Sequence, residues 1–466
     1  MTAQTILPAN SASGGFDVAN SMLFDGTSNH THKTPSSSGS QRKFSFSAWV
    51  KKTDFSTGVL LSSGEADGNP NLALYFDSSS RINMYSTQGM QYITTRVFRD
   101  AHAWYHIMFV VDTASSNANN RQQLYVNGVR ETVFSTSTAI GQNTDLSINT
   151  GDYRMSVGTG VDDEDYFGGY MAEVVFLDNQ ALGPTSFGEF DEDSNIWKPI
   201  RIAGSAATPG TNGFYLDFQA SGNLGNDVFG GTDLTEVNVG VLNQKTDTCT
   251  NNFCTLTPLT KLTDATLQAD LCRVTYGTAS TRRAVFGSMV FTAGKWYCET
   301  KVTATSQTSV EMNLGISNTY NPENIGNALV SNNGFTVSYF PAGSGGALYI
   351  GTTRDEQNLG ALAVNDILGM ALDMDNGTLQ FYKNNSALGS ANSITTGDSD
   401  DGELYPGFTV ANSCSSGGQT FTASHNFGNP TFSGTDQSDE NGFGSFEYAP
   451  PSGFLAMCTK NLAENG

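Results

Sequence analysis

Alternating carboxylates near the middle of the chain are the strongest candidate for catalytic chemistry. Glu189, Asp191 and Asp193 are spaced two residues apart, so they would share one face of a β-strand. Two carboxyl groups on one face can serve as nucleophile and acid/base in glycoside hydrolysis. However, Pro and Gly precede the segment, Ser and Asn follow it, and no apolar alternation accompanies it. We therefore interpret it as a non-catalytic turn and predict that the protein is not an enzyme. A polysaccharide depolymerase is the enzyme alternative.

A second run of carboxylates, residues 162–165, stands directly before an expected strand. Carboxylate oxygens are the hard ligands that calcium prefers. Four successive acidic side chains cannot all face one ion, so at most two of them would bind it. A solvated acidic loop is the simpler interpretation, and calcium is the alternative, with Asp162, Asp163 or Asp165 as candidate ligands. We predict no other cofactor.

Histidine and cysteine give no metal or nucleophile pattern. His30 and His32 fall in a polar stretch that we expect to be an irregular loop, and His102 and His106 flank a tryptophan near a strand start. The six cysteines include no CxxC pair, which argues against zinc. Cys249 and Cys254 are close enough in sequence to form a disulfide, but free thiols are the favoured interpretation.

Charge and hydropathy exclude several partners. The 466 residues include 23 basic and 45 acidic side chains, a formal net charge of −22. Such a surface repels phosphate backbones and anionic lipid, so nucleic acid and membranes are poor partners. The first residues lack the basic and apolar regions of a signal peptide, and no apolar stretch is long enough to span a bilayer.

The elements that must position these residues are β-strands. Phe44, Phe46 and Ala48 alternate with Ser45, Ser47 and Trp49. The Asn127-Gly128 pair predicts a tight hairpin turn, and residues 375–377, which stand between two apolar runs, predict a second hairpin. Further strands are expected at Asn71–Phe76, Trp104–Val111, Gln123–Val126, Tyr170–Phe176, Ile367–Asp373 and Thr378–Lys383.

Composition changes along the chain suggest five segments. Residues 1–21 form a small, polar arm without a core of its own. Residues 22–200 and 266–437 each contain enough strands for a β-sandwich. Residues 201–265 are an irregular connector that should pack against its neighbours, and residues 438–466 are a tail whose Pro450-Pro451 pair excludes a central strand.

The first sandwich resembles the laminin-G or concanavalin A-like jelly roll, which implies an all-β domain that presents loops to a ligand. The residues that carry the resemblance, in family order, are Leu23–Gly26, Phe44–Val50, Trp104–His106, Leu124–Gly128 and Tyr166–Val174. The second sandwich resembles a SPRY domain. Its matching residues are Gly294–Cys298, Leu314–Ile316, Leu368–Asp373, Asp375–Gly377, Leu379–Asn384, Tyr405-Pro406 and Asn426–Gly428.

Nearly the whole chain also resembles virion proteins of tailed bacteriophages. The matching phrases are His32–Ser37, Gly210–Phe218, Asp247–Phe253, Pro450–Thr459 and Asn461-Leu462. This resemblance implies a tail or head fibre, or a spike, made in the host cytoplasm and released by lysis, with the arm of residues 1–21 as its virion anchor. Its partners would be other virion proteins and a host-surface glycan or protein, bound weakly through several copies of a homo-oligomer such as a trimer. The alternative is a purely structural capsid decoration or tail adaptor.

Candidate binding residues are aromatic or cationic side chains near expected turns. Tyr85, Tyr92, Tyr153 and Tyr166 stand at such positions, and Tyr153 and Tyr166 are the ones that we select. SPRY domains generally bind through rim loops, which the resemblance places at residues 319–327, 342–346 and 352–357. Arg354 in the last of these is the candidate cation.

Overall fold

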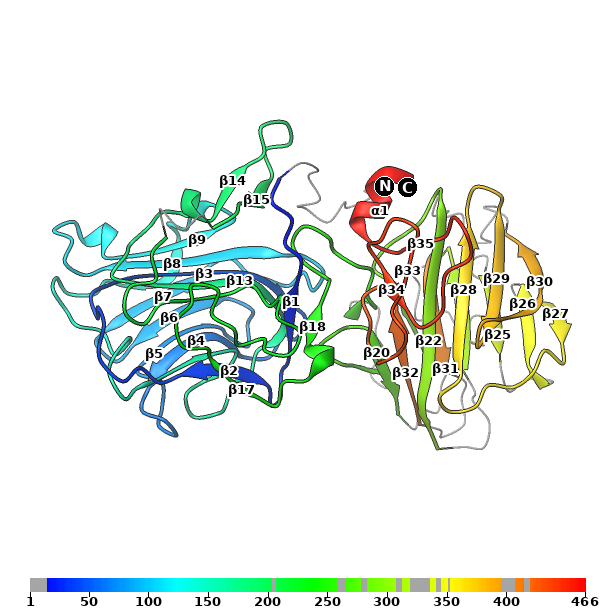
Figure 1. Ribbon diagram of the computed structural model, residues 1–466, viewed down its shortest axis with the longest axis horizontal. Helices are drawn as coiled ribbons and strands as arrows, with labels where there is room; N and C mark the ends of the chain where they lie inside the picture. Colours follow the sequence, from blue (N-terminus) through cyan, green and yellow to red (C-terminus); the bar gives the residue numbers. More distant parts are fainter. Residues whose placement is uncertain are drawn as a thin grey trace. The chain divides into compact units, whose positions relative to one another are not determined.

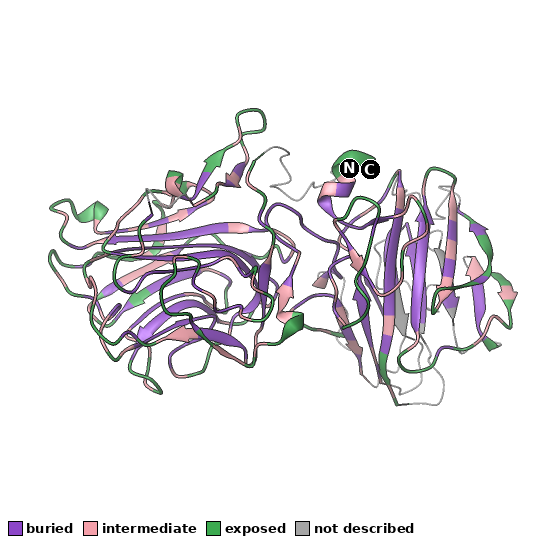
Figure 2. Cartoon of the chain, in the orientation of Figure 1, coloured by how far each residue is buried: buried purple, intermediate pink, exposed green. Residues whose placement is uncertain are grey.

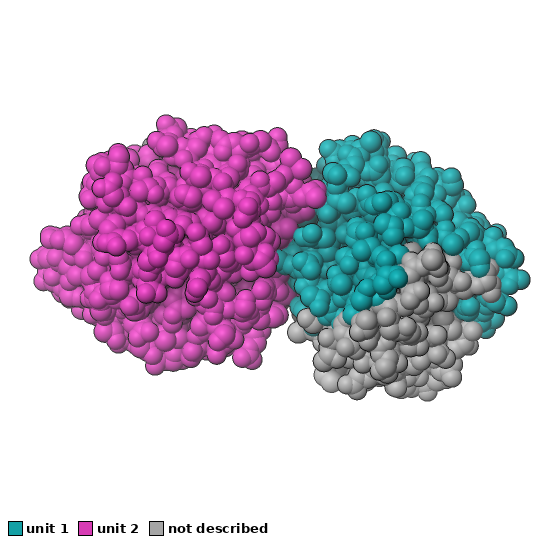
Figure 3. Space-filling model, turned by 90° about the horizontal axis from the view of Figure 1, so that it is seen from below, with its two compact units in different colours: residues 1–7, 252–466 teal, residues 8–251 magenta. Residues whose placement is uncertain are grey.

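The computed structural model describes residues 15–202, 207–258, 265–277, 283–306, 312–318, 336–340, 345–350, 353–394, 407–414 and 420–466. These residues divide into two compact units, coloured separately in Figure 3. We call residues 8–251 the N-terminal unit and residues 252–466 the C-terminal unit. Both are built from antiparallel sheets, so the predicted all-β fold with two tandem sandwiches is confirmed (Figure 1).

One sheet of the N-terminal unit follows the order β10 (Val129–Arg130), β9 (Gln122–Val126), β8 (Tyr105–Asp112), β3 (Lys43–Lys52), β13 (Gly168–Asp178), β1 (Ser21–Asp25) and β18 (Gln244–Lys245), and β16 (Phe214–Leu216) also pairs with β13. The facing sheet follows the order β11 (Phe134–Thr138), β7 (Met90–Thr94), β6 (Ile82–Ser86), β5 (Leu72–Phe76), β4 (Gly58–Gly64), β12 (Arg154–Val157), β2 (His30–Lys33) and β17 (Thr235–Val237). The predicted strands and the Asn127-Gly128 hairpin between β9 and β10 are present, and both turn residues have the positive φ that this turn type requires.

The core of the N-terminal unit lies between these two sheets. Phe44, Phe46 and Ala48 on β3 contribute to it, as their alternation predicts. The opposite face of the same strand is not solvated, because Ser45 and Ser47 are also buried. A second apolar layer, which includes Phe187 and Tyr215, covers that outer face. Figure 2 shows that the strands of the unit are buried over most of their length.

Residues 207–251, within the expected connector, are part of the N-terminal unit. Strand β16 pairs with β13, β17 with β2 and β18 with β1, so this stretch extends both sheets. Its strands are only two or three residues long, and nothing in their local sequence indicates which strand they join. Residues 1–14 of the expected arm lie outside the described residues, whereas Val18 is buried and its amide donates to the Thr250 hydroxyl.

The outer face of β3 holds a fully buried ion pair. The Lys51 ammonium lies 2.8 Å from a carboxylate oxygen of Asp247, and neither side chain is exposed to solvent. The Trp104 indole donates to the other oxygen of Asp247 at 3.1 Å. Two charges removed from water in this way must balance each other, so residue 247 fixes the end of the N-terminal unit against β3.

The C-terminal unit has one sheet in the order β19 (Ala265–Leu267), β20 (Arg273–Tyr276), β32 (Phe421–Asn426), β22 (Lys295–Thr305), β28 (Ile367–Asp373), β29 (Thr378–Lys383) and β30 (Ser386–Ser393). The other follows β21 (Arg283–Phe286), β31 (Thr409–Cys414), β23 (Met312–Ser317), β25 (Thr336–Phe340), β26 (Ala347–Ile350) and β27 (Thr353–Gln357). Strands β28 and β29 form the predicted hairpin.

The tail returns to the C-terminal unit after β32. Strand β35 (Leu455–Ala456) pairs in parallel with β22, and helix α1 (Thr459–Asn465) follows it. The buried Glu299 carboxylate accepts hydrogen bonds from the amides of Glu447 at 2.9 Å and Tyr448 at 2.8 Å. Within the described residues, no helix has the length and apolarity needed to cross a membrane.

Candidate ligand-binding site

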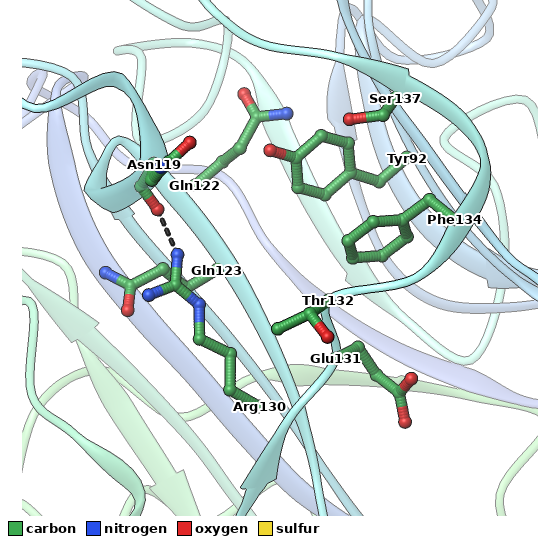
Figure 4. A pocket seen from close by; sticks show the side chains of 9 residues that line it. All are labelled: Tyr92, Asn119, Gln122, Gln123, Arg130, Glu131, Thr132, Phe134 and Ser137. Carbon is green, nitrogen blue, oxygen red and sulfur yellow. Dashed lines mark hydrogen bonds between the residues drawn. The ribbon is translucent and has the colours of Figure 1, made fainter.

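A cleft of about 330 Å³ opens at one side of the N-terminal unit, where the β7–β11 edge of one sheet faces the β9–β10 hairpin of the other (Figure 4). We call it the Tyr92 cleft. It is lined by Tyr92, Asn119, Gln122, Gln123, Arg130, Glu131, Thr132, Phe134 and Ser137. Its size lies at the lower end of the range for small-molecule sites.

Two stacked aromatic rings form the apolar wall of the Tyr92 cleft. Tyr92 on β7 and Phe134 on the edge strand β11 have ring centroids 4.3 Å apart and planes inclined by 28°. The pairing of β11 with β7 is interrupted by a bulge just after Phe134, which lets both rings lie on the same side. Both rings are half-buried, so they offer apolar surface to a ligand.

The amide side chains that line the cleft are held in fixed positions. Gln122 is fully buried, donates to the Thr138 carbonyl at 2.9 Å and accepts from the Ile140 amide at 2.8 Å. Gln123 donates to the Asn120 carbonyl and accepts from a tyrosine hydroxyl. The cleft is therefore built before a ligand arrives, which lowers the entropy cost of binding.

Several polar groups in the cleft are left available to a ligand. Within the described residues, the Tyr92, Thr132 and Ser137 hydroxyls and the Asn119 side-chain amide form no hydrogen bond with the protein. Asn119, Thr132 and Ser137 are exposed. An aromatic wall beside free hydroxyl and amide groups suits a ligand that has both an apolar face and many hydroxyls.

The two charged side chains that line the cleft, Arg130 and Glu131, are of opposite sign and have different partners. Glu131 pairs with Arg96 at 2.8 Å, and its carboxylate points away from Arg130 in Figure 4. The Arg130 guanidinium donates to the Asn119 carbonyl and forms no ion pair within the described part of the chain. Arg130 can therefore also meet an acidic group of a ligand.

The predicted binding residues belong to both units: Tyr153 and Tyr166 to the N-terminal unit and Arg354 to the C-terminal unit. Tyr153 is half-buried in the turn before β12, and Tyr166 is half-buried with its ring centroid 6.0 Å from that of His30. Arg354 is exposed, but it lies on the edge strand β27, so the expected loop at 352–357 is wrong for residues 353–357. Residues 319–327, 342–344 and 352 lie outside the described residues.

The acidic loop is organised by an arginine. The Asp163 carboxylate lies 2.5 Å from the Arg154 guanidinium, and this hydrogen bond lowers the pKa of Asp163. Burial raises the pKa of Asp165, and the nearby Asp162 adds to that effect. In the described ranges, no three His, Cys, Asp or Glu side chains gather as metal ligands. Calcium binding at Asp162, Asp163 or Asp165 stays a prediction.

The histidines of β2 lie beside this loop. His30 and His32 belong to a strand, so the expected irregular loop is wrong there; β2 is held between β12 and β17. Burial and, to a smaller extent, the nearby Arg154 charge lower the pKa of His32 to about 4. His32 is therefore neutral at physiological pH.

Of the alternating carboxylates, Glu189 lies on β14 (Gly188–Phe190), which forms a small hairpin with β15 (Trp197–Pro199) (Figure 1), whereas Asp191 and Asp193 lie in the turn between the two strands. Lys198 lies 3.5 Å from Glu189 and 3.0 Å from Asp191. Hydrogen bonds from Ser194 and Lys198 strongly lower the pKa of Asp191. A carboxyl group so strongly held in its ionised form is a poor proton donor for glycoside cleavage.

A buried Ser–His pair resembles a catalytic nucleophile and its base, but the histidine donates to the serine hydroxyl instead of accepting its proton. The Ser47 hydroxyl lies 2.8 Å from His106 Nε2, and the Trp197 indole donates to His106 Nδ1 at 3.1 Å. Since Nδ1 accepts, Nε2 carries the proton and donates to Ser47. His106 therefore cannot deprotonate Ser47, and the pair serves to anchor β15 on the sheet.

The cysteines agree with the thiol interpretation. Within the described residues, Cys249, Cys254, Cys272, Cys298 and Cys458 are buried and form no disulfide. Burial raises the pKa of Cys249 and Cys298, which makes both thiols unreactive.

Sequence reasoning noted Tyr92 but missed the rest of the Tyr92 cleft. Asn119, Arg130 and Phe134 come from three separate segments whose proximity follows from the pairing of β7 with β11 and of β9 with β10. The Asn127-Gly128 turn was the one local signal, because it reverses the chain between Gln123 and Arg130.

Two family matches agree with this architecture. Residues 25–185 match the concanavalin A-like lectin/glucanases superfamily, and residues 295–422 match the SPRY domain. No curated protein matches the sequence.

Three solved structures illustrate the similarity of fold. The SPRY domain of human HERC1 is 15% identical, with a TM-score of 0.29, over 36% of this chain and 96% of its own. A Bacteroides ovatus protein to which carbohydrate binding is ascribed is 15% identical, with a TM-score of 0.36, over 50% of this chain and 60% of its own. The SAP-like pentraxin of Limulus polyphemus is 15% identical, with a TM-score of 0.27, over 36% of this chain and 80% of its own. Along the chain, a region that matches the concanavalin A-like lectin/glucanases superfamily is therefore followed by a region that matches the SPRY domain.

Proposed function

We propose that the protein is a carbohydrate-binding protein and that the Tyr92 cleft of its N-terminal unit holds the sugar. The observation that carries this proposal is the stacked Tyr92–Phe134 wall beside hydroxyl and amide groups that have no partner in the described protein. A sugar ring has an apolar face that rests on aromatic carbon and hydroxyls that need hydrogen bonds. The match to the concanavalin A-like lectin superfamily agrees with this chemistry.

The replacement Tyr92→Ala should weaken saccharide binding at least tenfold, or by about 1.4 kcal/mol. The change removes a ring that forms half of the apolar wall and a hydroxyl that faces the cleft. A glycan array with the full-length protein would identify ligands, and isothermal titration of the best ligand would give the affinity of each variant.

Tyr85→Ala is the matched control, because Tyr85 lies on the neighbouring strand β6, is 36% exposed and does not line the cleft. It should bind saccharide like the unmodified protein. Equal binding by Tyr92→Ala and the unmodified protein would refute the cleft as the sugar site. A protein that binds no saccharide on the array would contradict the proposed function as a whole.

We further propose that the chain is a non-enzymatic virion component that contacts the host surface, in the manner of a fibre or spike. Support comes from the phage-like sequence phrases and from two domains that belong to binding-module families. Weak sites become useful when several copies bind together. A capsid decoration or tail adaptor is the alternative within the same virion role.

Antibody raised against residues 266–437 should label intact particles of the virus that encodes the chain. Label on the tail or its fibres, seen by electron microscopy, is the expected result for host attachment. Label over the head would favour the decoration alternative. Unlabelled particles, when the same antibody recognises the native purified protein, would contradict a virion role.

A further inference from the structure

A second cleft in the N-terminal unit, of about 580 Å³, has no residue in common with the Tyr92 cleft. Three segments far apart in sequence line it: residues 32–37 from the end of β2, residues 209–213 before β16, and residues 227–235, which lead into β17. We call it the Lys33 cleft.

The walls of the Lys33 cleft are fixed by buried polar side chains. Asn212 donates to the Ser37 carbonyl at 2.9 Å and to the Asn149 side chain at 2.6 Å. Asp178, also buried, accepts from the amides of Thr211 and Asn212. These contacts hold the segment 209–213 against the segment 32–37, so the cleft does not depend on a ligand for its shape.

The third wall is held by Asp227. Its carboxylate accepts from the amides of Tyr215 at 2.9 Å, Phe229 at 3.1 Å and Gly231 at 3.1 Å. Asp233 in turn accepts from the Asp227 amide at 3.0 Å. Both carboxylates are therefore used in part to shape the loop.

Lys33 provides the one cationic side chain among the residues that line this cleft. It is half-buried, and its nitrogen lies 5.9 Å from the centroid of the buried Phe214 ring. Burial lowers the pKa of Lys33, whereas Asp227 and Asp233 raise it. In the part of the chain that the structure describes, Lys33 forms no ion pair within 4.0 Å, so its N–H groups can donate to a ligand.

Exposed hydroxyl groups surround Lys33. Six side chains on the three segments are exposed and form no side-chain hydrogen bond within the described residues: Thr34, Ser36, Ser37, Thr211, Thr232 and Thr235. No Phe, Tyr or Trp side chain is among the lining residues. Recognition in this cleft must therefore rest on hydrogen bonds rather than on ring stacking.

The charges in the cleft argue against an acidic ligand. Two carboxylates, Asp227 and Asp233, stand against the single ammonium of Lys33, and the whole chain carries a formal charge of −22. A free phosphate or an acidic sugar would be repelled, whereas uncharged hydroxyls can both accept from Lys33 and donate to the carboxylates.

We propose that the Lys33 cleft is a second saccharide site, which binds an uncharged, polyhydroxylated segment of a glycan. The Lys33 ammonium donates to hydroxyl oxygens of the ligand, and the exposed Ser and Thr hydroxyls exchange hydrogen bonds with its other hydroxyls. This inference rests on the proposed function only in assigning a sugar to the protein, because no residue of the Tyr92 cleft takes part.

The test uses the full-length protein in affinity gels that contain neutral dextran, mannan or laminarin, or acidic alginate. Lys33→Met should reduce affinity for a neutral polysaccharide at least tenfold, and the double change Ser36→Ala with Thr232→Val should reduce it severalfold. Both substituted side chains of the double variant are exposed, so it should fold normally. Lys460→Met, which removes one positive charge from the C-terminal unit, is the control and should bind normally.

Tyr92→Ala in the same gels separates the two sites. Loss of neutral-glycan binding in the Lys33 variants, with retention in Tyr92→Ala, would support the Lys33 cleft whatever becomes of the Tyr92 cleft. Normal binding by both Lys33-cleft variants would overturn this inference and leave the proposed function standing if Tyr92→Ala loses binding. Binding of alginate alone through Lys33, or of none of the polysaccharides, would also overturn it.

Discussion

Replacement of Asp247 by alanine is expected to destabilise the N-terminal unit by about 3–5 kcal/mol. The change would leave the Lys51 ammonium, which is 0% exposed, buried without its counter-ion. It would also remove the acceptor of the Trp104 indole. Urea unfolding followed by tryptophan fluorescence would measure the loss, in a Trp296→Phe background so that the signal comes from the N-terminal unit alone.

Two controls separate the buried pair from a general charge effect. Asp145→Ala breaks the Arg42–Asp145 pair, which is about half exposed on both sides, and should destabilise the protein far less, because water screens an exposed pair. The double change Lys51→Met with Asp247→Leu removes both buried charges and should recover much of the stability. Equal losses for Asp247→Ala and Asp145→Ala would contradict the role assigned to the buried pair.

Glu299→Ala should destabilise the C-terminal unit by about 2–4 kcal/mol, because the amides of Glu447 and Tyr448 lose their acceptor. The effect should be concentrated in the tail. Hydrogen exchange read by mass spectrometry should therefore show early loss of protection at residues 445–458, before the β22–β28 pair opens. Unchanged protection of the tail would refute this role of Glu299.

The same residue predicts a pH dependence. Burial raises the pKa of Glu299 to about 7 in the folded protein, against 4.5 for an ordinary glutamate. The folded state therefore retains a proton that the unfolded chain releases, and this contribution to stability is complete below pH 4.5 and is lost as the pH rises through 7. Glu299→Gln cannot titrate, so its unfolding midpoint should lack this decline. Parallel pH profiles for the two proteins would contradict the raised pKa.

Local sequence was sufficient for the elements whose signals are local. The alternation at Phe44–Trp49 predicted strand β3, and Asn127-Gly128 predicted the β9–β10 hairpin, because each pattern depends on neighbouring residues alone. Strands β16, β17 and β18 could not be found in this way. They are too short to show a period, and they form only because the edges of β13, β2 and β1 are there to pair with.

The candidate sites were less predictable for the same reason. Tyr92 was recognised as an aromatic side chain near a turn, but Phe134 reaches the cleft only through the pairing of β11 with β7, and Arg130 only through the pairing of β10 with β9. The phrases at 32–37 and 210–218 were noted for their resemblance to other sequences, yet nothing in either phrase indicated that they face each other across the Lys33 cleft. Nothing in the local sequence indicates that Lys51 is buried, because its partner Asp247 lies 196 residues away.

Strands β16, β17 and β18 pair with the N-terminal sheets. They must therefore be included in the shortest segment of the chain that can be transferred as a complete lectin-like domain. The family match ends at residue 185, but a protein cut there would leave β13, β1 and β2 with open edges, which invite aggregation. Such a truncation would also remove Asp247, which is the counter-ion of the buried Lys51. Grafting or recombination of this module therefore requires a junction at Asn251-Asn252, where one compact unit gives way to the next.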